Sequence, residues 1–558
     1  MRIISPGRKR CLALFPAIAL CLQLAGCGGG SGAGAGAGTA AATAGATVSG
    51  PLNPPQAARF LNQATYGARL QDIATLQAQG IDAWITAQQA LPATAQYPLM
   101  LASADKYSRN NRLTFWWNTA VSGPDQLRQR MALALSEIFV ISDQSSGLGN
   151  NGDAIALYWD LLANDAFGNF RTLLQDVTLS PQMGLYLNML GNQKPDPAHN
   201  IHADENYARE VMQLFTIGLW TLNPDGSQAL DANGRPQPTY GQAEVSNLAR
   251  ALTGWSWLGT DFFYSPSDFV DPMTAFQAEH DRGAKTIVGG VSIPANGSAE
   301  ADLQIALDTL FNHPNTPPFI SRQLIQHLVT SNPSPAYVGR VAAVFANNGK
   351  GTRGDLGAVV RAILEDPEAR SDAAAAAPGF GKRREPLVTL AHLWRVLDGH
   401  DANGSRQYWN PDYDLKQAPL SAPSVFNFFK PGFSPSGVVQ KAGLVAPEFQ
   451  LVTASNLALL HNFYYYAAID RATANSYTQP TDILLHPGSD LLALATASDT
   501  GAMVDQLALA MMAGQMSAAM RTAVVTDVNA ISAKDGGYAR VGEAAFQILA
   551  SPEYQIQR

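Results

Sequence analysis

The sequence predicts a mainly α-helical protein: a large multi-helix globular domain with a small β-hairpin-bearing insertion around residues 219–297. From Pro54 onward, apolar residues recur mostly at intervals of three and four, as in Leu127, Met131 and Leu135. Few stretches alternate with the period of two that is typical of a half-buried strand. With 46% hydrophobic residues, the chain can bury a large core, and a domain at 53–558 is long enough to form two lobes.

Helical periodicity predicts further helices in chain order, and the insertion is the main exception. The predicted helices lie at residues 154–164, 168–179, 204–217, 242–253, 300–312, 318–329, 335–347, 354–365, 384–398, 448–470, 502–513 and 538–550. In the insertion, Asn223-Pro224-Asp225-Gly226 and Asn233-Gly234 indicate turns, and Thr286-Ile287-Val288 indicates a strand.

Three helical stretches end in Ser or Asp followed by proline, at Ser180-Pro181, Asp366-Pro367 and Ser551-Pro552. The residue before a proline is disfavoured in the α conformation, so each helix ends there, and the Ser or Asp can cap a new helix that begins with the proline. The recurrence is explained either by common helix architecture or by an ancient duplication.

The N-terminal 26 residues have the features of a bacterial lipoprotein signal peptide. Four basic residues between Arg2 and Arg10 precede an apolar run at 11–24, which is too short to cross a bilayer. Leu24-Ala25-Gly26-Cys27 resembles the lipobox, in which the cysteine is acylated and becomes the new N-terminus. The short apolar run argues against the alternative, an uncleaved anchor. Both alternatives tether the protein to a membrane.

Residues 27–50 are rich in Gly and Ala and carry no charge, which predicts a flexible tether between the lipid on Cys27 and the folded domain. Gly28 follows the cysteine where an acidic residue would, by family resemblance, indicate retention in the inner membrane. We therefore expect a lipid-anchored protein of the bacterial cell envelope, at the outer membrane rather than the inner one.

Charge and motifs exclude several classes of function. The formal net charge is −8 and becomes −12 once the four basic residues of the signal peptide are removed, so the protein lacks the basic surface that nucleic-acid binding requires. Removal of the same segment takes away Cys11 and Cys21, so no internal disulfide is expected. The sequence contains no His-Glu-x-x-His zinc helix, no Gly-x-Ser-x-Gly elbow and no Walker loop.

Ionisable residues are densest between His199 and Glu210. One interpretation places His199, His202, Glu205 and Glu210 around a divalent metal ion or an activated water, with His202, Glu205, Arg209 and Glu210 as catalytic candidates. The structural interpretation needs no metal, because a Glu–Arg pair beside a buried helix commonly binds neighbouring backbone groups.

A second candidate is His280-Asp281, in which the adjacent carboxylate could orient the imidazole or share a metal ion with it. The alternative is that the pair fixes the insertion through Arg282 or Lys285. The histidines without ligand spacing are interpreted as structural: His313, His327, His392, His400, His461 and His486.

Aromatic residues form clusters at Trp116-Trp117, at Trp255 and Trp257, at 426–429 and at Tyr464-Tyr465-Tyr466. Such faces could stack on sugar rings of a surface polysaccharide. The alternative is packing, because large aromatic side chains are also the main fillers of helical cores.

The sequence also resembles a family of bacterial proteins known only as domain of unknown function 1800, over roughly residues 53–556. The resemblance rests on these segments: Glu205-Asn206-Tyr207-Ala208-Arg209-Glu210, Ala249-Arg250-Ala251-Leu252-Thr253-Gly254-Trp255, His280-Asp281-Arg282-Gly283-Ala284-Lys285, Arg383-Arg384-Glu385-Pro386 and Pro423-Ser424-Val425-Phe426-Asn427. It implies a mostly helical exported protein with no established activity. It also implies an exported protein partner of phosphatase-like fold.

The chain departs from this family at three positions. Many relatives carry Phe-Trp-His-Asn-His where this chain has Phe115-Trp116-Trp117-Asn118-Thr119, and His where it has Phe215. A site built from those three histidines cannot exist here. The resulting hypothesis is a binding or scaffold role with another exported protein or a surface polysaccharide. The alternative is a metal-assisted hydrolase that uses the acidic and histidine cluster at residues 199–210.

Overall fold

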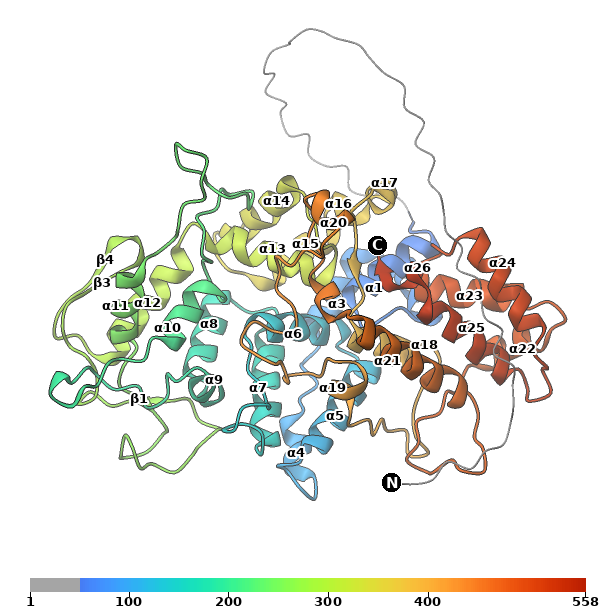
Figure 1. Cartoon of the computed structure of the whole chain (residues 1–558), viewed down its shortest axis with the longest axis horizontal. Coiled ribbons are helices and arrows are strands. Elements are labelled where there is room, and N and C mark those ends of the chain that lie inside the picture. The colour runs from blue at the N-terminus through green and yellow to red at the C-terminus, as the bar shows by residue number, and fades with distance from the viewer. Residues whose placement is uncertain (1–50) are drawn as a thin grey trace, which may run out of the picture. The chain divides into compact units, whose positions relative to one another are not determined.

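The structure is a computed structural model that describes residues 51–558. The signal peptide at 1–26, the tether at 27–50 and the lipidation site Cys27 lie outside the described residues. Within them the chain forms 26 α-helices and three two-stranded antiparallel sheets (Figure 1). The mainly α-helical fold class is therefore confirmed.

The α-helices follow one another through the whole described chain. The first group consists of α1 Pro54–Ala64, α2 Leu70–Gln79, α3 Ile81–Ala90, α4 Tyr97–Ala102, α5 Arg109–Ser122, α6 Gln126–Ile138, α7 Gly152–Asp165, α8 Phe170–Leu179 and α9 Pro181–Tyr186. The second consists of α10 Asn206–Gln213, α11 Gln242–Ala251, α12 Ala299–Asn312, α13 Thr316–Leu328, α14 Pro335–Ala346, α15 Leu356–Glu365, α16 Pro367–Arg370 and α17 Asp372–Ala376. The third consists of α18 Pro386–Val396, α19 Pro411–Asp414, α20 Val438–Lys441, α21 Ala454–Tyr465, α22 Ser489–Thr496, α23 Gly501–Met512, α24 Ala518–Asn529, α25 Tyr538–Ala550 and α26 Pro552–Gln555.

The insertion between residues 219 and 297 contains the expected hairpin. Strand β3 (Lys285–Ile287) pairs with β4 (Val291–Ile293), with Thr286 opposite Ser292. The connection runs through Gly289 and Gly290, both at φ +72°, a backbone conformation that glycine adopts without strain. A second pair joins β1 (Trp255–Ser256) to β2 (Thr274–Ala275).

The third sheet was not predicted from the sequence. Strand β5 (Lys382–Arg383) pairs with β6 (Ile556–Gln557) at the C-terminus of the chain, with Lys382 opposite Gln557. Strands of two residues carry no readable alternation, and their partner lies far away along the chain. This pairing fixes the backbone immediately before Glu385, which is central to the candidate site.

The helix–cap–proline junctions form at all three predicted places. The side chain of Asp366 accepts a hydrogen bond from Glu368 N, and that of Ser551 accepts one from Tyr554 N, so both residues cap the short helix that follows. Ser180 instead donates its hydroxyl to Gln182 Oε1 at 2.7 Å.

One predicted helix, at residues 448–470, is broken in the structure. It consists of a 3-10 turn (Pro447–Leu451), then α21, then a π-helical turn (Tyr466–Asp470). Thr453 starts α21 as its N-cap by accepting a hydrogen bond from Asn456 N. The break leaves Glu448 in the preceding turn, where its carboxylate is 3.0 Å from Lys382 Nζ.

Aromatic residues at the positions where relatives carry histidine belong to the core. Trp117, at one of these positions, is buried and makes an edge-to-face contact with its neighbour Trp116, with ring centroids 4.9 Å apart. Trp117 also packs on Trp394, and Phe215 packs on Phe139 with centroids 5.2 Å apart. These positions therefore serve packing in this protein.

Within the described chain, the insertion and the C-terminal helices lie at opposite ends. Figure 1 shows α10–α12 with β1, β3 and β4 at one end, and α22–α25 at the other, with α6, α13 and α18 between them. Among residues 51–558, no helix combines the length and apolar character needed to cross a membrane.

Two carboxyl groups, Asp165 at the end of α7 and Asp176 on α8, give a pH-dependent stability prediction. Burial and the neighbouring Asp176 raise the pKa of Asp165 to about 7. Since the unfolded carboxyl releases its proton near pH 4, the folded state is penalised progressively as the pH rises from about 4 to 7. We expect Asp165→Asn to remove this slope and to raise the free energy of unfolding at pH 8 by on the order of 1 kcal/mol after solvent screening. Urea unfolding of the wild type and of Asp165→Asn at pH 5 and pH 8 measures this difference in stability. An equal pH dependence of stability in the two proteins would refute the raised pKa of Asp165.

Candidate functional site

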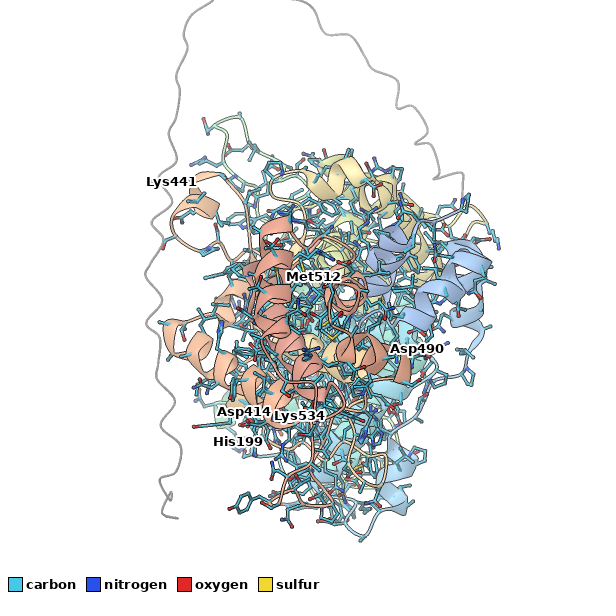
Figure 2. The ribbon with its side chains drawn as sticks, turned by 90° about the vertical axis from the view of Figure 1, so that its right-hand side faces the viewer. His199, Asp414, Lys441, Asp490, Met512 and Lys534 are labelled. Carbon is cyan, nitrogen blue, oxygen red and sulfur yellow. The ribbon has the colours of Figure 1, made fainter. Side chains whose placement is uncertain are left out.

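The two histidines of the 199–210 segment lie at the surface. His199 ends a 3-10 turn (Pro197–His199), and its Nδ1 is 2.6 Å from Asp196 Oδ2. Its side chain is 74% exposed, in keeping with its peripheral position in Figure 2. His202 is also exposed. Neither imidazole is brought against a buried carboxylate.

Glu205 connects helices α10 and α11. Its carboxylate accepts hydrogen bonds from Gln242 and Ser246 of α11, and its Oε2 lies 2.9 Å from Arg209 on its own helix. Burial raises the pKa of Glu205, but Ser246, Gln242 and Arg209 outweigh it and lower the pKa. Glu205 and Arg209 thus make the contacts that the structural interpretation describes. Glu210 is buried, which raises its pKa, and its Oε2 has no hydrogen-bond partner among the described residues.

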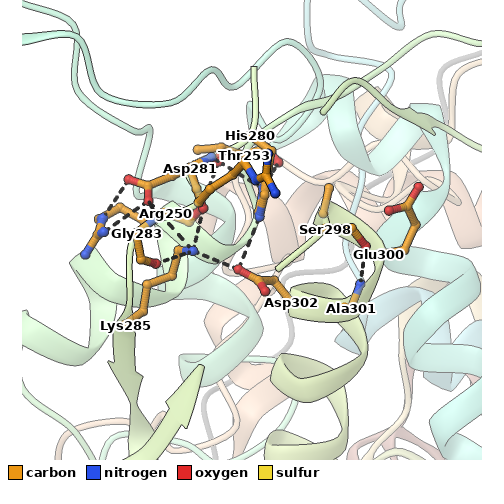
Figure 3. Close-up of polar contacts among 12 residues, drawn as sticks. Arg250, Thr253, His280, Asp281, Gly283, Lys285, Ser298, Glu300, Ala301 and Asp302 are labelled. Carbon is orange, nitrogen blue, oxygen red and sulfur yellow. Dashed lines mark hydrogen bonds and ion pairs between the residues drawn. The ribbon is translucent and has the colours of Figure 1, made fainter. Parts of the chain in front are cut away.

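His280 is held in a buried ionic network (Figure 3). Its Nδ1 lies 2.9 Å from the Thr253 carbonyl oxygen, and its Nε2 lies 3.1 Å from Asp302 Oδ2. Lys285 Nζ donates to the same Asp302 oxygen at 2.7 Å. Both ring nitrogens of His280 face protein oxygens, so neither offers a free lone pair to a metal ion.

Asp281 is occupied as well. Arg250 of α11 binds its two carboxylate oxygens at 2.8 and 3.0 Å, and Gly283 N donates to one of them. A two-pronged arginine contact of this kind is a strong structural link, and here it joins the β3 loop to α11. Residues 199–210 and His280-Asp281 thus belong to different networks.

A third group of residues, which no spacing in the sequence brings together, has the composition of a reactive or metal-binding site. Glu137, His327 and Glu385 each place one ligand atom within 4.8 Å of the others, and all three residues are buried. Among residues 51–558, it is the one group of His, Cys, Asp and Glu side chains that meets this geometry.

Three elements position this group. Glu137 lies in the last turn of α6, His327 in the last turn of α13, and Glu385 directly before Pro386, the first residue of α18. Gln417 from a loop links the two carboxyl groups, because its Nε2 donates to Glu137 Oε1 at 3.1 Å and to Glu385 Oε2 at 2.7 Å.

Two buried cations complete the cluster. Arg130, on the same helix as Glu137, donates to the His327 carbonyl oxygen at 2.6 Å, and Lys382 Nζ donates to the same oxygen at 2.8 Å. Cations at the C-terminal end of a helix stabilise its partial negative charge. Lys382 also lies 3.2 Å from Glu385 Oε1. The cations therefore need Glu385 as a counter-charge.

The same environment separates the protonation states of the three groups. Burial raises the pKa of Glu385, but Lys382 and Arg130 outweigh it and lower the pKa to about 2, so Glu385 is ionised. Burial, and then the charge of Glu385, raises the pKa of Glu137 well above its usual value. Burial and Lys382 lower the pKa of His327 to about 3, so its imidazole is neutral. An acid, a carboxylate and a neutral imidazole thus lie together.

Glu137 and His327 face each other in an unusual way. Glu137 Oε2 is 2.9 Å from His327 Nδ1, yet neither atom has a hydrogen-bond partner among the described residues. The two atoms are close without the directionality that a hydrogen bond requires. Unsatisfied buried polar atoms are costly in folding free energy, and their persistence is typical of functional sites.

The cluster lies at a cavity of about 760 Å³, within the range of small-molecule binding sites. Glu137, His327 and Glu448 line it, and most of the remaining wall is apolar. The wall comes from α13, from the 218–228 arm of the insertion and from the 425–432 loop. It includes the following larger side chains: Leu214, Trp220, Phe319, Val425, Phe429 and Pro447.

Sequence spacing could not reveal this site, because its members lie 58 to 248 positions apart along the chain. The one feature of the sequence that pointed to these residues was the resemblance to the family. Arg383-Arg384-Glu385-Pro386 and Pro423-Ser424-Val425-Phe426-Asn427 carry the resemblance, and they supply Glu385 and part of the cavity wall.

Comparison with known proteins gives one match. No curated protein and no solved structure is similar enough to count as a match. The family model described as "Protein of unknown function (DUF1800)" matches residues 59–556, which is nearly the whole chain. The chain therefore belongs to the family of proteins of unknown function DUF1800.

Proposed function

We propose that the protein is a cell-envelope hydrolase whose substrate occupies the cavity, with the bond to be cleaved at Glu137, His327 and Glu385. The observation that carries the proposal is the unpartnered pair of atoms, Glu137 Oε2 and His327 Nδ1, at the wall of a largely apolar cavity. Perturbed carboxyl and imidazole groups in a cavity are typical of sites that move protons or activate water.

The cavity wall favours a substrate with an apolar body and an anionic group. Arg322 and Lys430 line the cavity, both are exposed, and neither forms an ion pair with an acidic residue of the described chain. Lys430 Nζ instead lies 4.8 Å from the ring centroid of Phe426. Two cations beside aromatic walls attract a negatively charged amphiphile more strongly than a neutral sugar.

Replacement of Glu137 tests the hydrolase proposal. A panel of chromogenic esters, phosphoesters, amides and glycosides should include one that the mature wild-type protein cleaves. Glu137→Gln should lower kcat/KM for it by about 100-fold or more, because a group that transfers a proton or activates water contributes on that scale. Glu543→Gln, on the distant helix α25, is the matched control and should leave turnover unchanged. The absence of turnover of every compound, or equal turnover by Glu137→Gln, would contradict the proposal.

The location in the envelope is part of this proposal and follows from Cys27. We expect Cys27→Ala to abolish incorporation of labelled fatty acid and to release the protein from the membrane fraction, because a single lipid-modified cysteine would be its anchor. Membrane fractionation combined with acyl labelling measures the fatty-acid incorporation and the membrane association. Continued labelling of the variant would refute the anchor.

A partner-binding role is a second candidate, favoured by one loop of the insertion. Between residues 258 and 270, the side chains of Leu258, Phe263, Tyr264 and Val270 are all exposed, and Tyr264 is 85% exposed. Exposed apolar groups gathered in one loop are typical of an interaction surface. The wild type should capture a stoichiometric envelope partner, and the double variant Phe263→Ser plus Tyr264→Ser should lose it. Capture of the same partner by the wild type and the double variant would refute the partner-binding role.

A further inference from the structure

We infer that Glu137, His327 and Glu385 form a binding site for one divalent transition-metal cation at the wall of the cavity. The inference deepens the proposed function and rests on it for its chemistry: a cation there would polarise the substrate and activate a water molecule. The existence of the metal site, however, can be tested without any substrate.

The spacing of the two unpartnered atoms fits a shared cation. Two ligand atoms that each lie about 2.1 Å from one metal ion are about 3.0 Å apart at a right angle and about 3.4 Å apart at the tetrahedral angle. Glu137 Oε2 and His327 Nδ1 are 2.9 Å apart. Their lone pairs do not point at each other, since neither atom forms a hydrogen bond. If the lone pairs of both atoms point at a cation between them, the short distance and the missing hydrogen bond are both explained.

The donor set indicates which cations fit. One imidazole nitrogen and two carboxylates suit Zn²⁺, Mn²⁺ or Fe²⁺, whereas Mg²⁺ and Ca²⁺ prefer oxygen alone. Gln417 donates a hydrogen bond to each of the two carboxyl groups, and such supporting hydrogen bonds orient metal ligands.

The charge of the cluster also leaves room for a cation. Three buried carboxyl groups, on Glu137, Glu385 and Glu448, face two buried cations, Lys382 and Arg130. These two cations offset two of the carboxylates, and the third carboxyl group can exchange its proton for a metal ion. Glu448, whose Oε2 has no hydrogen-bond partner among the described residues, also lines the cavity.

The experiment is calorimetric titration of Zn²⁺ into the mature, untagged, chelator-treated protein. We expect one equivalent to bind to the wild type, and Glu137→Gln and His327→Gln to bind it more than tenfold more weakly. Glu137→Gln is close in shape to the native side chain, so it keeps the test valid even where His327→Gln impairs folding. His461→Gln, at a half-buried histidine of α21, is the matched control and should bind like the wild type.

The inference is overturned if the wild type binds less than one equivalent, if Glu137→Gln binds zinc normally, or if His202→Gln or Glu205→Gln removes the binding instead. Failure of this inference is distinguishable from failure of the proposed function. Zinc binding without turnover of any chromogenic compound leaves the metal site and removes the hydrolase. Turnover that depends on Glu137, in a protein that does not bind zinc, leaves the hydrolase and removes the metal site.

Discussion

Glu385→Gln is expected to lower the free energy of unfolding by about 3–5 kcal/mol, while Glu137→Gln changes it by about 1 kcal/mol or less. The two residues share one buried cluster, but Glu385 is the ionised partner of Lys382 and Arg130. Its removal leaves the buried Arg130 without a carboxylate partner and Lys382 with Glu448 alone. Glu137 holds a proton, because its pKa is raised well above the usual value, so a neutral amide replaces a neutral acid.

Urea unfolding at pH 7 in the presence of a chelator measures both variants without a contribution from bound metal. We expect the double variant Glu137→Gln plus Glu385→Gln to lose more than the sum of the single losses, because Glu137 can ionise and replace part of the missing charge when Glu385 is absent. Equal effects of the two single variants would show that the proton is not on Glu137.

Asp302→Asn should destabilise the insertion by about 3–5 kcal/mol. Asp302 is 1% exposed and is the carboxylate that Lys285 and His280 both contact, at 2.7 and 3.1 Å. The Lys285 ammonium is itself buried, and the substitution leaves it only the carboxylate of Asp281, which is 3.7 Å away and already bound by Arg250. We expect hydrogen exchange to accelerate most strongly in β3, β4 and α11.

The matched control is Asp308→Asn on the same helix, α12. Asp308 also forms an ion pair, with Arg171, but its side chain is 59% exposed, so the loss should be below about 1 kcal/mol. Lys285→Met on the Asp302→Asn background should recover much of the stability, since it removes the buried charge. Equal losses at Asp302 and Asp308 would contradict the role given to burial.

Local sequence patterns predicted the helical fold well where one apolar face decides the structure. The stretches predicted at 335–347 and 538–550 are α14 and α25, within a residue of the predicted ends. The helix predicted at 448–470 was wrong in its continuity, because Thr453 caps a new helix and Glu448 pairs with Lys382. The β5–β6 pairing depends on contact between distant segments, which no local pattern records.

The candidate site depends even more on tertiary structure. The predicted residues Glu205 and Asp281 carry recognisable charge spacing, and the fold joins them to Arg209 and Arg250 respectively. His327 has no ligand spacing in the sequence and was grouped with the structural histidines. Only the packing of α6 against α13 brings Glu137 to it.

The central claim is that ligand atoms of Glu137, His327 and Glu385 converge on a single point beside the cavity. Crystals of the mature protein grown with Zn²⁺ and measured at the zinc absorption edge test it directly. We expect one strong anomalous peak, between Glu137 Oε2 and His327 Nδ1. A peak at His199, His202 and Glu205 or at His280-Asp281, or no peak within the cavity, would contradict it.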